Sequence, residues 1–166
     1  MAYWRMQLHP DNASEAARHS VESLAAGYIG LDFATDVRDL KRMTKPQFEQ
    51  LLPRQKPYCA FAEEMAEGDK VLIMLHNFPF ALVTVDGEYN YILNVSPELG
   101  VWFRHFRKVK AVMYYSDYVT NAHKWKSIPM PETITPLRDP KGDTYQLIEE
   151  WLQAASPAVA AAAAAE

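Results

Sequence analysis

Residues 101–110, VWFRHFRKVK, place large aromatic rings and positive charges together in one short segment. Three rings alternate with four cations and one histidine: Trp102, Phe103, Phe106, Arg104, Arg107, Lys108, Lys110 and His105. Aromatic rings stack on nucleobases, which contributes roughly 1–3 kcal/mol per base. Lysine and arginine bind backbone phosphates. The composition of this segment therefore predicts contact with a nucleic acid.

The distribution of charge along the chain is uneven, although the net charge is only −4. Residues 38–56 hold six Lys/Arg and two acids, and residues 102–126 hold six Lys/Arg and one acid. The rest of the chain holds five Lys/Arg and eighteen acids. Because salt screens charges over ~8–10 Å, a local basic face binds phosphate even on an acidic domain. The alternative is chance clustering on a solvated surface.

Further aromatic residues fall at the expected ends of strands, where rings can form the walls of a slot for a flat ligand. Tyr89 and Tyr91 lie on one face of a strand next to a turn, and Phe33 ends a strand before a polar loop. Trp4 lies beside Arg5 in the first expected strand. We expect these rings to form a base-binding pocket that is flanked by cations.

The sequence contains no motif for catalysis or cofactor binding. It has no P-loop, no G-x-G-x-x-G, no G-x-S-x-G and no H-E-x-x-H. The five histidines are far apart without metal-ligand spacing, so we expect no metal and no cofactor. The single cysteine, Cys59, excludes an internal disulfide and a multi-cysteine zinc site and is typical of a reducing, cytoplasmic compartment. No apolar run approaches the ~20 residues of a membrane-spanning helix.

The pattern of elements predicts an α+β fold with a small, mostly antiparallel curled sheet, a partial β-barrel, flanked by helices. Strands are expected at 3–8, 28–33, 70–75, 80–93, 101–115 and 132–137, with Asp86-Gly87 as a hairpin turn or bulge. Helices are expected before Gly27, at 45–52, before Gly68 and at 143–153. Residues 1–153 then form one domain, and the alanine-rich residues 154–166 a linker or tail.

In order and spacing, the segments GYIGLDF, EGDKVLIML and GVWFRHFRKVK resemble the EVE and YTH domains of the PUA-like superfamily. The resemblance covers roughly residues 3–153. It implies a PUA-like curled mixed sheet of about five to six strands. EVE-type domains are found fused to bacterial restriction nucleases, where they recognise modified bases in DNA. YTH domains read N6-methyladenine in RNA through an aromatic cage.

The resemblance also implies roles for particular residues. Leu31 or Phe33 stands at the first cage position with Asp32 between them, Tyr89 and Tyr91 match the second, and Leu99 closes the pocket. Polar groups that read the base edge are implied among His9, Asp11 and Asn12, and Asp139 offers a carboxylate ahead of the closing helix. The implied phosphate ligands are Arg38, Lys41, Arg42, Arg104, Arg107 and Lys108. The rings of 101–110 are then expected inside the barrel, and its cations outside.

The resulting hypothesis is a non-catalytic reader that flips a modified base out of double-stranded DNA. The expected bases are 5-methylcytosine or 5-hydroxymethylcytosine, with N6-methyladenine a close second. The reader would be the specificity module of a modification-dependent restriction endonuclease, with a fused or associated nuclease domain and no membrane partner. Three alternatives stay open: an RNA-binding module, a small enzyme of the related ASCH type using Lys45, Thr44 and Asp39, and a protein-interaction module.

Overall fold

The computed structural model describes residues 1–9, 13–33, 37–53 and 55–163. Asp11 and Asn12, two of the expected base-edge residues, lie outside these ranges. The strands are β1 (Tyr3–Gln7), β2 (Tyr28–Leu31), β3 (Lys70–Leu75), β4 (Phe78–Tyr91), β5 (His105–Tyr114) and β6 (Ile134–Leu137). The α-helices are α1 (Ala16–Ala25), α2 (Lys45–Gln50), α3 (Pro57–Glu63), α4 (Tyr115–Tyr118) and α5 (Asp143–Ala163). Short 3₁₀ turns are η1 (Ala13–Glu15), η2 (Leu40–Arg42), η3 (Pro97–Leu99) and η4 (Ala122–Lys124).

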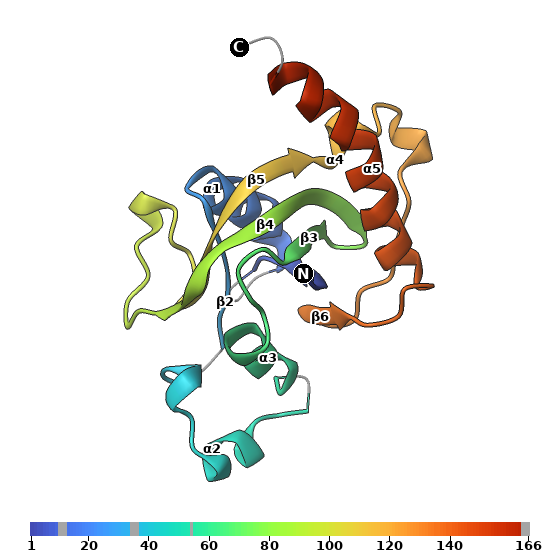
Figure 1. The fold of residues 1–166 in the computed structure, drawn as a ribbon. Helices are drawn as coiled ribbons and strands as arrows, with labels where there is room; N and C mark the ends of the chain where they lie inside the picture. Colours follow the sequence, from blue (N-terminus) through green and yellow to red (C-terminus); the bar gives the residue numbers. More distant parts are fainter. Residues whose placement is uncertain (10–12, 34–36, 54, 164–166) are drawn as a thin grey trace.

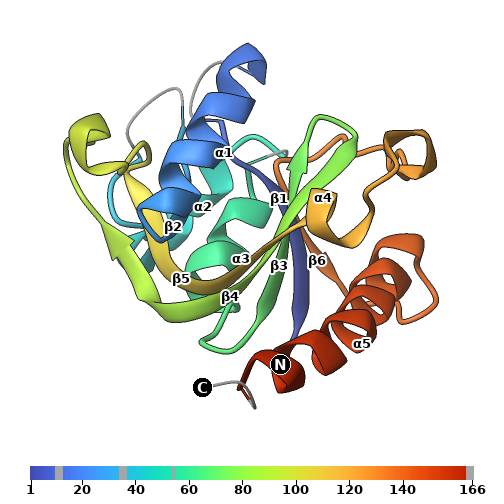
Figure 2. The same ribbon diagram turned by 90° about the horizontal axis from the view of Figure 1, so that it is seen from above.

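The strands form one curled, six-stranded sheet in the order β2-β5-β4-β3-β1-β6 (Figure 1). The pair β1–β3 is parallel, and the other pairs are antiparallel. Helices α1 and α5 lie on opposite sides of the molecule, and the sheet runs between them (Figure 2). The predicted α+β fold, a curled sheet flanked by helices, is therefore confirmed.

The two faces of the sheet bury two separate apolar clusters. Inside the curl, residues of the central strands pack with Phe61 of α3 and Leu40 of η2. Outside it, the opposite face packs against α4 and α5 through Trp151. β3 lies between the clusters, since Val71 and Ile73 belong to the first and Leu72 and Met74 to the second. This is why the segment KVLIML is continuously apolar: a strand that is buried on both faces has no solvent face.

Two of the sequence-based expectations change in detail. Asp86-Gly87 is not a hairpin turn, because β4 continues through it to Tyr91 with a register shift between Val85 and Tyr89. It forms the bulge that was the other alternative. The alanine-rich segment continues the closing helix, because α5 reaches Ala163 instead of ending near residue 153. Alanine's high helix propensity accounts for this extension.

The buried carboxylate of Asp69 ties the start of β1 to the turn before β3. It accepts hydrogen bonds from Ala2 N (2.7 Å), Ala66 N (3.0 Å) and the indole Nε1 of Trp4 (3.0 Å). Trp4 is only 2% exposed, so it belongs to the core. The prediction that Trp4 lines a base pocket is therefore wrong, because its ring is packed inside the curl and its N–H is bound to Asp69.

The Asp69→Ala variant is expected to lower the free energy of unfolding by about 3 kcal/mol, because it leaves buried donors without an acceptor. Urea unfolding followed by tryptophan fluorescence measures this change. Asp69→Asn keeps one acceptor oxygen and should fall between the wild type and the alanine variant. A loss below about 0.5 kcal/mol for Asp69→Ala would contradict the role given to this carboxylate.

Candidate nucleic-acid interface

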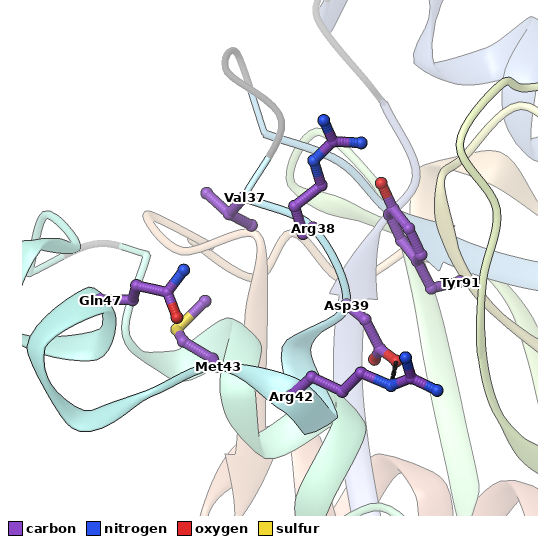
Figure 3. A pocket seen from close by; sticks show the side chains of 7 residues that line it. All are labelled: Val37, Arg38, Asp39, Arg42, Met43, Gln47 and Tyr91. Carbon is purple, nitrogen blue, oxygen red and sulfur yellow. Dashed lines mark ion pairs between the residues drawn. The ribbon is translucent and has the colours of Figure 1, made fainter.

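An open hollow of about 380 Å³ lies between the end of β4 and the segment that carries η2 and α2. Figure 3 shows Arg38 beside the ring of Tyr91, Met43 and Gln47 across from them, and the ion pair of Asp39 with Arg42 at the lower rim. Its lining residues are Val37, Arg38, Asp39, Arg42, Met43, Gln47 and Tyr91. We call it the Tyr91 pocket. Its volume falls within the ~300–1,000 Å³ typical of small-molecule sites.

A second hollow of about 290 Å³ adjoins the Tyr91 pocket. The two share Val37, Arg38, Met43 and Gln47, and the second extends along α2 to Gln50, Leu51 and Gln55. We call it the glutamine hollow. The shared residues form one continuous wall, so a ligand in one hollow lies next to a ligand in the other.

Local sequence fixes the backbone of this wall. The Asp39 carboxylate accepts from Lys41 N (3.0 Å) at the start of η2, and it pairs with Arg42 at 3.4 Å. At the start of α2, Thr44 and Gln47 form a capping box. Arg38 has a φ of 63°, the left-handed region that non-glycine residues adopt only under constraint. These contacts place the arginine side chains at the rim of the pocket.

Tyr89 lies beneath the pocket and does not form its wall. Its side chain is 6% exposed, and its hydroxyl accepts from Leu40 N (2.9 Å) and lies 2.8 Å from Nδ1 of buried His105. Burial raises the pKa of Tyr89, so the phenol stays neutral and can donate its proton to His105. Lys41 lies over the Tyr89 ring at 5.9 Å. The prediction that Tyr89 walls the pocket is wrong, since this residue holds η2 onto the sheet instead.

Phe33 and Leu31 also belong to the core, at 2% and 1% exposure. The Phe33 ring meets Tyr58 and His105 edge-on, at 5.0 and 5.3 Å between centroids. Tyr91 packs against the other side of this group, 5.3 Å from His105, and is itself half-buried. Of the four aromatic residues predicted for the pocket, the structure therefore places only Tyr91 at an open hollow that it describes.

The remaining predicted pocket residues are dispersed. Leu99 in η3 is 70% exposed and does not line the Tyr91 pocket. Asp139 lines a different hollow, of about 330 Å³, beside Arg5 and the start of α5. His9 is half-buried at the end of β1, where burial, together with the nearby His19 and His76, lowers its pKa. None of these three residues lines the Tyr91 pocket, because chain order does not set which end of the sheet a loop occupies.

Two of the six predicted phosphate ligands, Arg107 and Arg104, donate their hydrogen bonds to groups within the protein. Arg107 is 3% exposed and donates from Nε to Phe61 O (2.8 Å), from Nη1 to Gly87 O (3.0 Å) and from Nη2 to Ala62 O (3.2 Å). The prediction that it binds phosphate is wrong, because its guanidinium faces into the core. Arg104 is half-buried, pairs with Asp32 at 2.6 Å and donates to Phe33 O (2.7 Å). Asp32 thus serves as its counterion rather than as a pocket wall.

The other four cations are exposed. Lys108 lies 3.6 Å from Asp86 on the outer face of β5, where Lys110 also pairs with Asp86 at 2.5 Å. Lys41 lies 3.9 Å from Glu88, and the side chain of Arg42 is 88% exposed. Arg38 and Arg42 both line the Tyr91 pocket. The basic segment that borders the hollow is therefore 38–56, and the outer cations of β5 lie on another face of the sheet.

Sequence reasoning missed several lining residues, above all Val37, Met43, Gln47 and the glutamines of the second hollow. One signal was present: Thr44-x-x-Gln47 has capping-box spacing and marks the start of α2.

The rings of 101–110 also divide between faces. Phe103 is in the core and Trp102 packs against it, 4.5 Å from His19 of α1, whereas Phe106 meets Tyr28 edge-on. The expectation that all of them pack inside the barrel is therefore wrong.

The chain matches no known protein-family model, and no curated protein matches it. Within the described ranges, no three His, Cys, Asp or Glu side chains are grouped as metal ligands. Within the same ranges, none of the helices has the length and apolar character needed to cross a bilayer. The class of site is thus defined by geometry alone: an open pocket with one aromatic wall and an arginine-bearing rim, at one end of a curled sheet.

Proposed function

We propose that this chain is a non-catalytic reader of a modified base in double-stranded DNA, and that the flipped base enters the Tyr91 pocket. The observation that carries the proposal is the combination in one hollow of an aromatic ring, two apolar side chains and two arginines: Tyr91, Val37, Met43, Arg38 and Arg42. A nucleobase needs a ring to stack on, and its backbone needs cations. The resemblance of the chain to EVE and YTH domains supports the same assignment.

The pocket has groups suited to both parts of a modified base. The Asp39 carboxylate can accept a hydrogen bond from an exocyclic amine, the donor that cytosine and adenine share. Val37 and Met43 offer apolar surface to a methyl group, which contributes ~1–3 kcal/mol in such a pocket. Extrusion of a base costs a few kcal/mol, and stacking on Tyr91 together with phosphate contacts offsets that cost. 5-methylcytosine and 5-hydroxymethylcytosine remain the first candidates and N6-methyladenine the next.

A reader without catalytic groups acts by delivering another activity to its target. We propose that a fused or associated nuclease supplies cleavage, as in the restriction enzymes that carry EVE-type domains, the domains that this sequence resembles. In this scheme the domain contributes only the choice of DNA. An RNA-binding role is the alternative outcome of the experiment below.

The direct test is a binding panel of otherwise identical short duplexes that carry 5-methylcytosine, 5-hydroxymethylcytosine, N6-methyladenine or no modification. We expect one modified duplex to bind at least tenfold more tightly than the unmodified one, because one methyl contact and its associated hydrogen bonds distinguish them. Affinity should fall as salt rises, with a log–log slope of about −0.9 for each phosphate contacted. Equal affinity for all four duplexes, or tighter binding to single-stranded RNA, would refute the proposed function.

A further inference from the structure

We infer that the glutamine hollow is a phosphate-binding subsite that takes the backbone phosphate next to the flipped nucleotide. The identity of the phosphate as a DNA phosphodiester rests on the proposed function. The chemistry of the subsite rests on the hydrogen bonds of its own side chains. Those bonds settle which atoms the hollow presents to a ligand.

Two of the three glutamines have their carbonyl oxygens occupied by the protein. Gln47 Oε1 accepts from Thr44 N and Thr44 Oγ1, both at 2.8 Å. Gln55 Oε1 accepts from Leu52 N at 3.0 Å. A backbone N–H can only donate, so these contacts fix which end of each amide faces the backbone. The NH₂ groups of Gln47 and Gln55 are therefore left for the hollow that both residues line.

The hollow consequently presents far more donors than acceptors. Arg38 also lines the hollow, and its guanidinium, although it has an interaction within the protein, carries donors and no acceptor. None of the lining side chains is a carboxylate, and Gln50 adds one further amide, with both a donor and an acceptor. The hydroxyls of a sugar donate as well as accept, and the side chains of this wall carry few acceptors for them. A phosphate diester only accepts and is negatively charged, so it matches the set.

The position of the subsite fits a nucleotide that occupies both hollows. Because Arg38 and Gln47 line both, a phosphate in the glutamine hollow lies beside a base in the Tyr91 pocket. Base and phosphate of one flipped nucleotide are joined through its sugar and must be bound close together. Arg38 is the residue that contacts both parts in this arrangement. The hollow would thus hold the flipped nucleotide in place by its backbone.

The Gln47→Glu variant tests the subsite without disturbing the helix. A glutamate at this position of a capping box still accepts from the Thr44 N–H, so α2 should begin as before. Its second oxygen, however, replaces the NH₂ donor with negative charge. We expect duplex affinity to fall at least tenfold, with the melting temperature within about 2 °C of wild type. Gln153→Glu, at an exposed position of α5, is the matched control, since it makes the same charge change elsewhere and should bind like wild type.

The source of the phosphate is determined with two further probes. In one set of duplexes, a single phosphate near the modified base is replaced by a neutral methylphosphonate, at a different position in each duplex. We expect one of these positions to weaken binding to the wild type. The same replacement should cause no further loss of affinity in Gln47→Glu. If titration with inorganic phosphate detects Gln47-dependent binding while duplex affinity is unchanged, the subsite serves a free phosphate and the DNA assignment is overturned. If Gln47→Glu and Gln153→Glu bind both probes equally, the subsite itself is refuted. If the wild type binds modified and unmodified duplexes equally, and Gln47→Glu still binds duplex more weakly than the wild type, only the proposed function is refuted.

Discussion

Replacement of Tyr91 with alanine should abolish the preference for modified over unmodified duplex and spare the salt-dependent binding common to both. Tyr91 is the one aromatic ring that lines the pocket within the described residues. Loss of a stacking partner removes roughly 1–3 kcal/mol per base, which is about five- to 150-fold in affinity. The arginines that contact the backbone remain in place, so weak, sequence-independent binding should persist with an unchanged salt slope. Competition binding with paired modified and unmodified duplexes measures both quantities.

The variant Tyr91→Phe separates the ring from its hydroxyl. It keeps the stacking surface and should retain most of the preference, since the face of the ring makes the predicted contact. A thermal melt of each variant shows whether the sheet is intact, because Tyr91 also packs against His105 at 5.3 Å. If Tyr91→Ala were folded and still selected the modified duplex as strongly as wild type, the base would have to bind elsewhere.

The fold was predictable because its signals are local. The apolar segment that became β3, Gly27 at the end of α1 and Gly68 before β3 each mark an element from its own residues. Both glycines have positive φ, at 81° and 91°, which explains why glycine stands in the turns that lead into β2 and β3. The strands pair mostly antiparallel, as expected, and the two longest, β4 and β5, carry register shifts where they pair.

The pocket was less predictable, because period-two alternation gives the face of a strand residue but not its depth. Tyr89 and Tyr91 point to the same face of β4, yet Tyr89 lies under η2 and Tyr91 reaches the rim. That difference depends on where residues 37–43 return to the sheet, a long-range contact that no local pattern encodes. The same holds for Arg38, because its position in both hollows depends on where residues 37–43 pack against the sheet.

For Arg107, the local pattern of the strand is sufficient to predict a buried side chain. Phe103, His105 and Val109 are buried, and position 107 lies on the same face of β5 by simple alternation. The exposed lysines of the strand, Lys108 and Lys110, fall on the other face. Consistent use of the alternation predicts an inward arginine, which requires acceptors inside the protein instead of a phosphate outside it.

The Arg107→Met variant should therefore destabilise the protein and should not act as a selective DNA-binding mutation. Arg107 satisfies the carbonyls of Phe61 and Ala62 in α3 and of Gly87 in the β4 bulge, and it lies 5.6 Å from the Phe61 ring. Burial lowers the pKa of its guanidinium, but arginine stays charged at neutral pH, so the buried charge needs these acceptors. Methionine fills much of the space but cannot donate, and we expect a loss of about 3 kcal/mol in the free energy of unfolding.

Lys108→Met is the matched control, because it removes a charge from the neighbouring exposed position and should change stability by no more than about 0.5 kcal/mol. Chemical denaturation of both variants gives the comparison. DNA affinity measured well below the melting temperature distinguishes the two roles of Arg107. If Arg107 were a phosphate ligand, Arg107→Met would weaken duplex binding at full stability and reduce the salt slope by about 1. Because the guanidinium is buried and makes three hydrogen bonds, we expect the reverse. The fraction of folded protein should fall, and the molecules that remain folded should bind DNA as the wild type does.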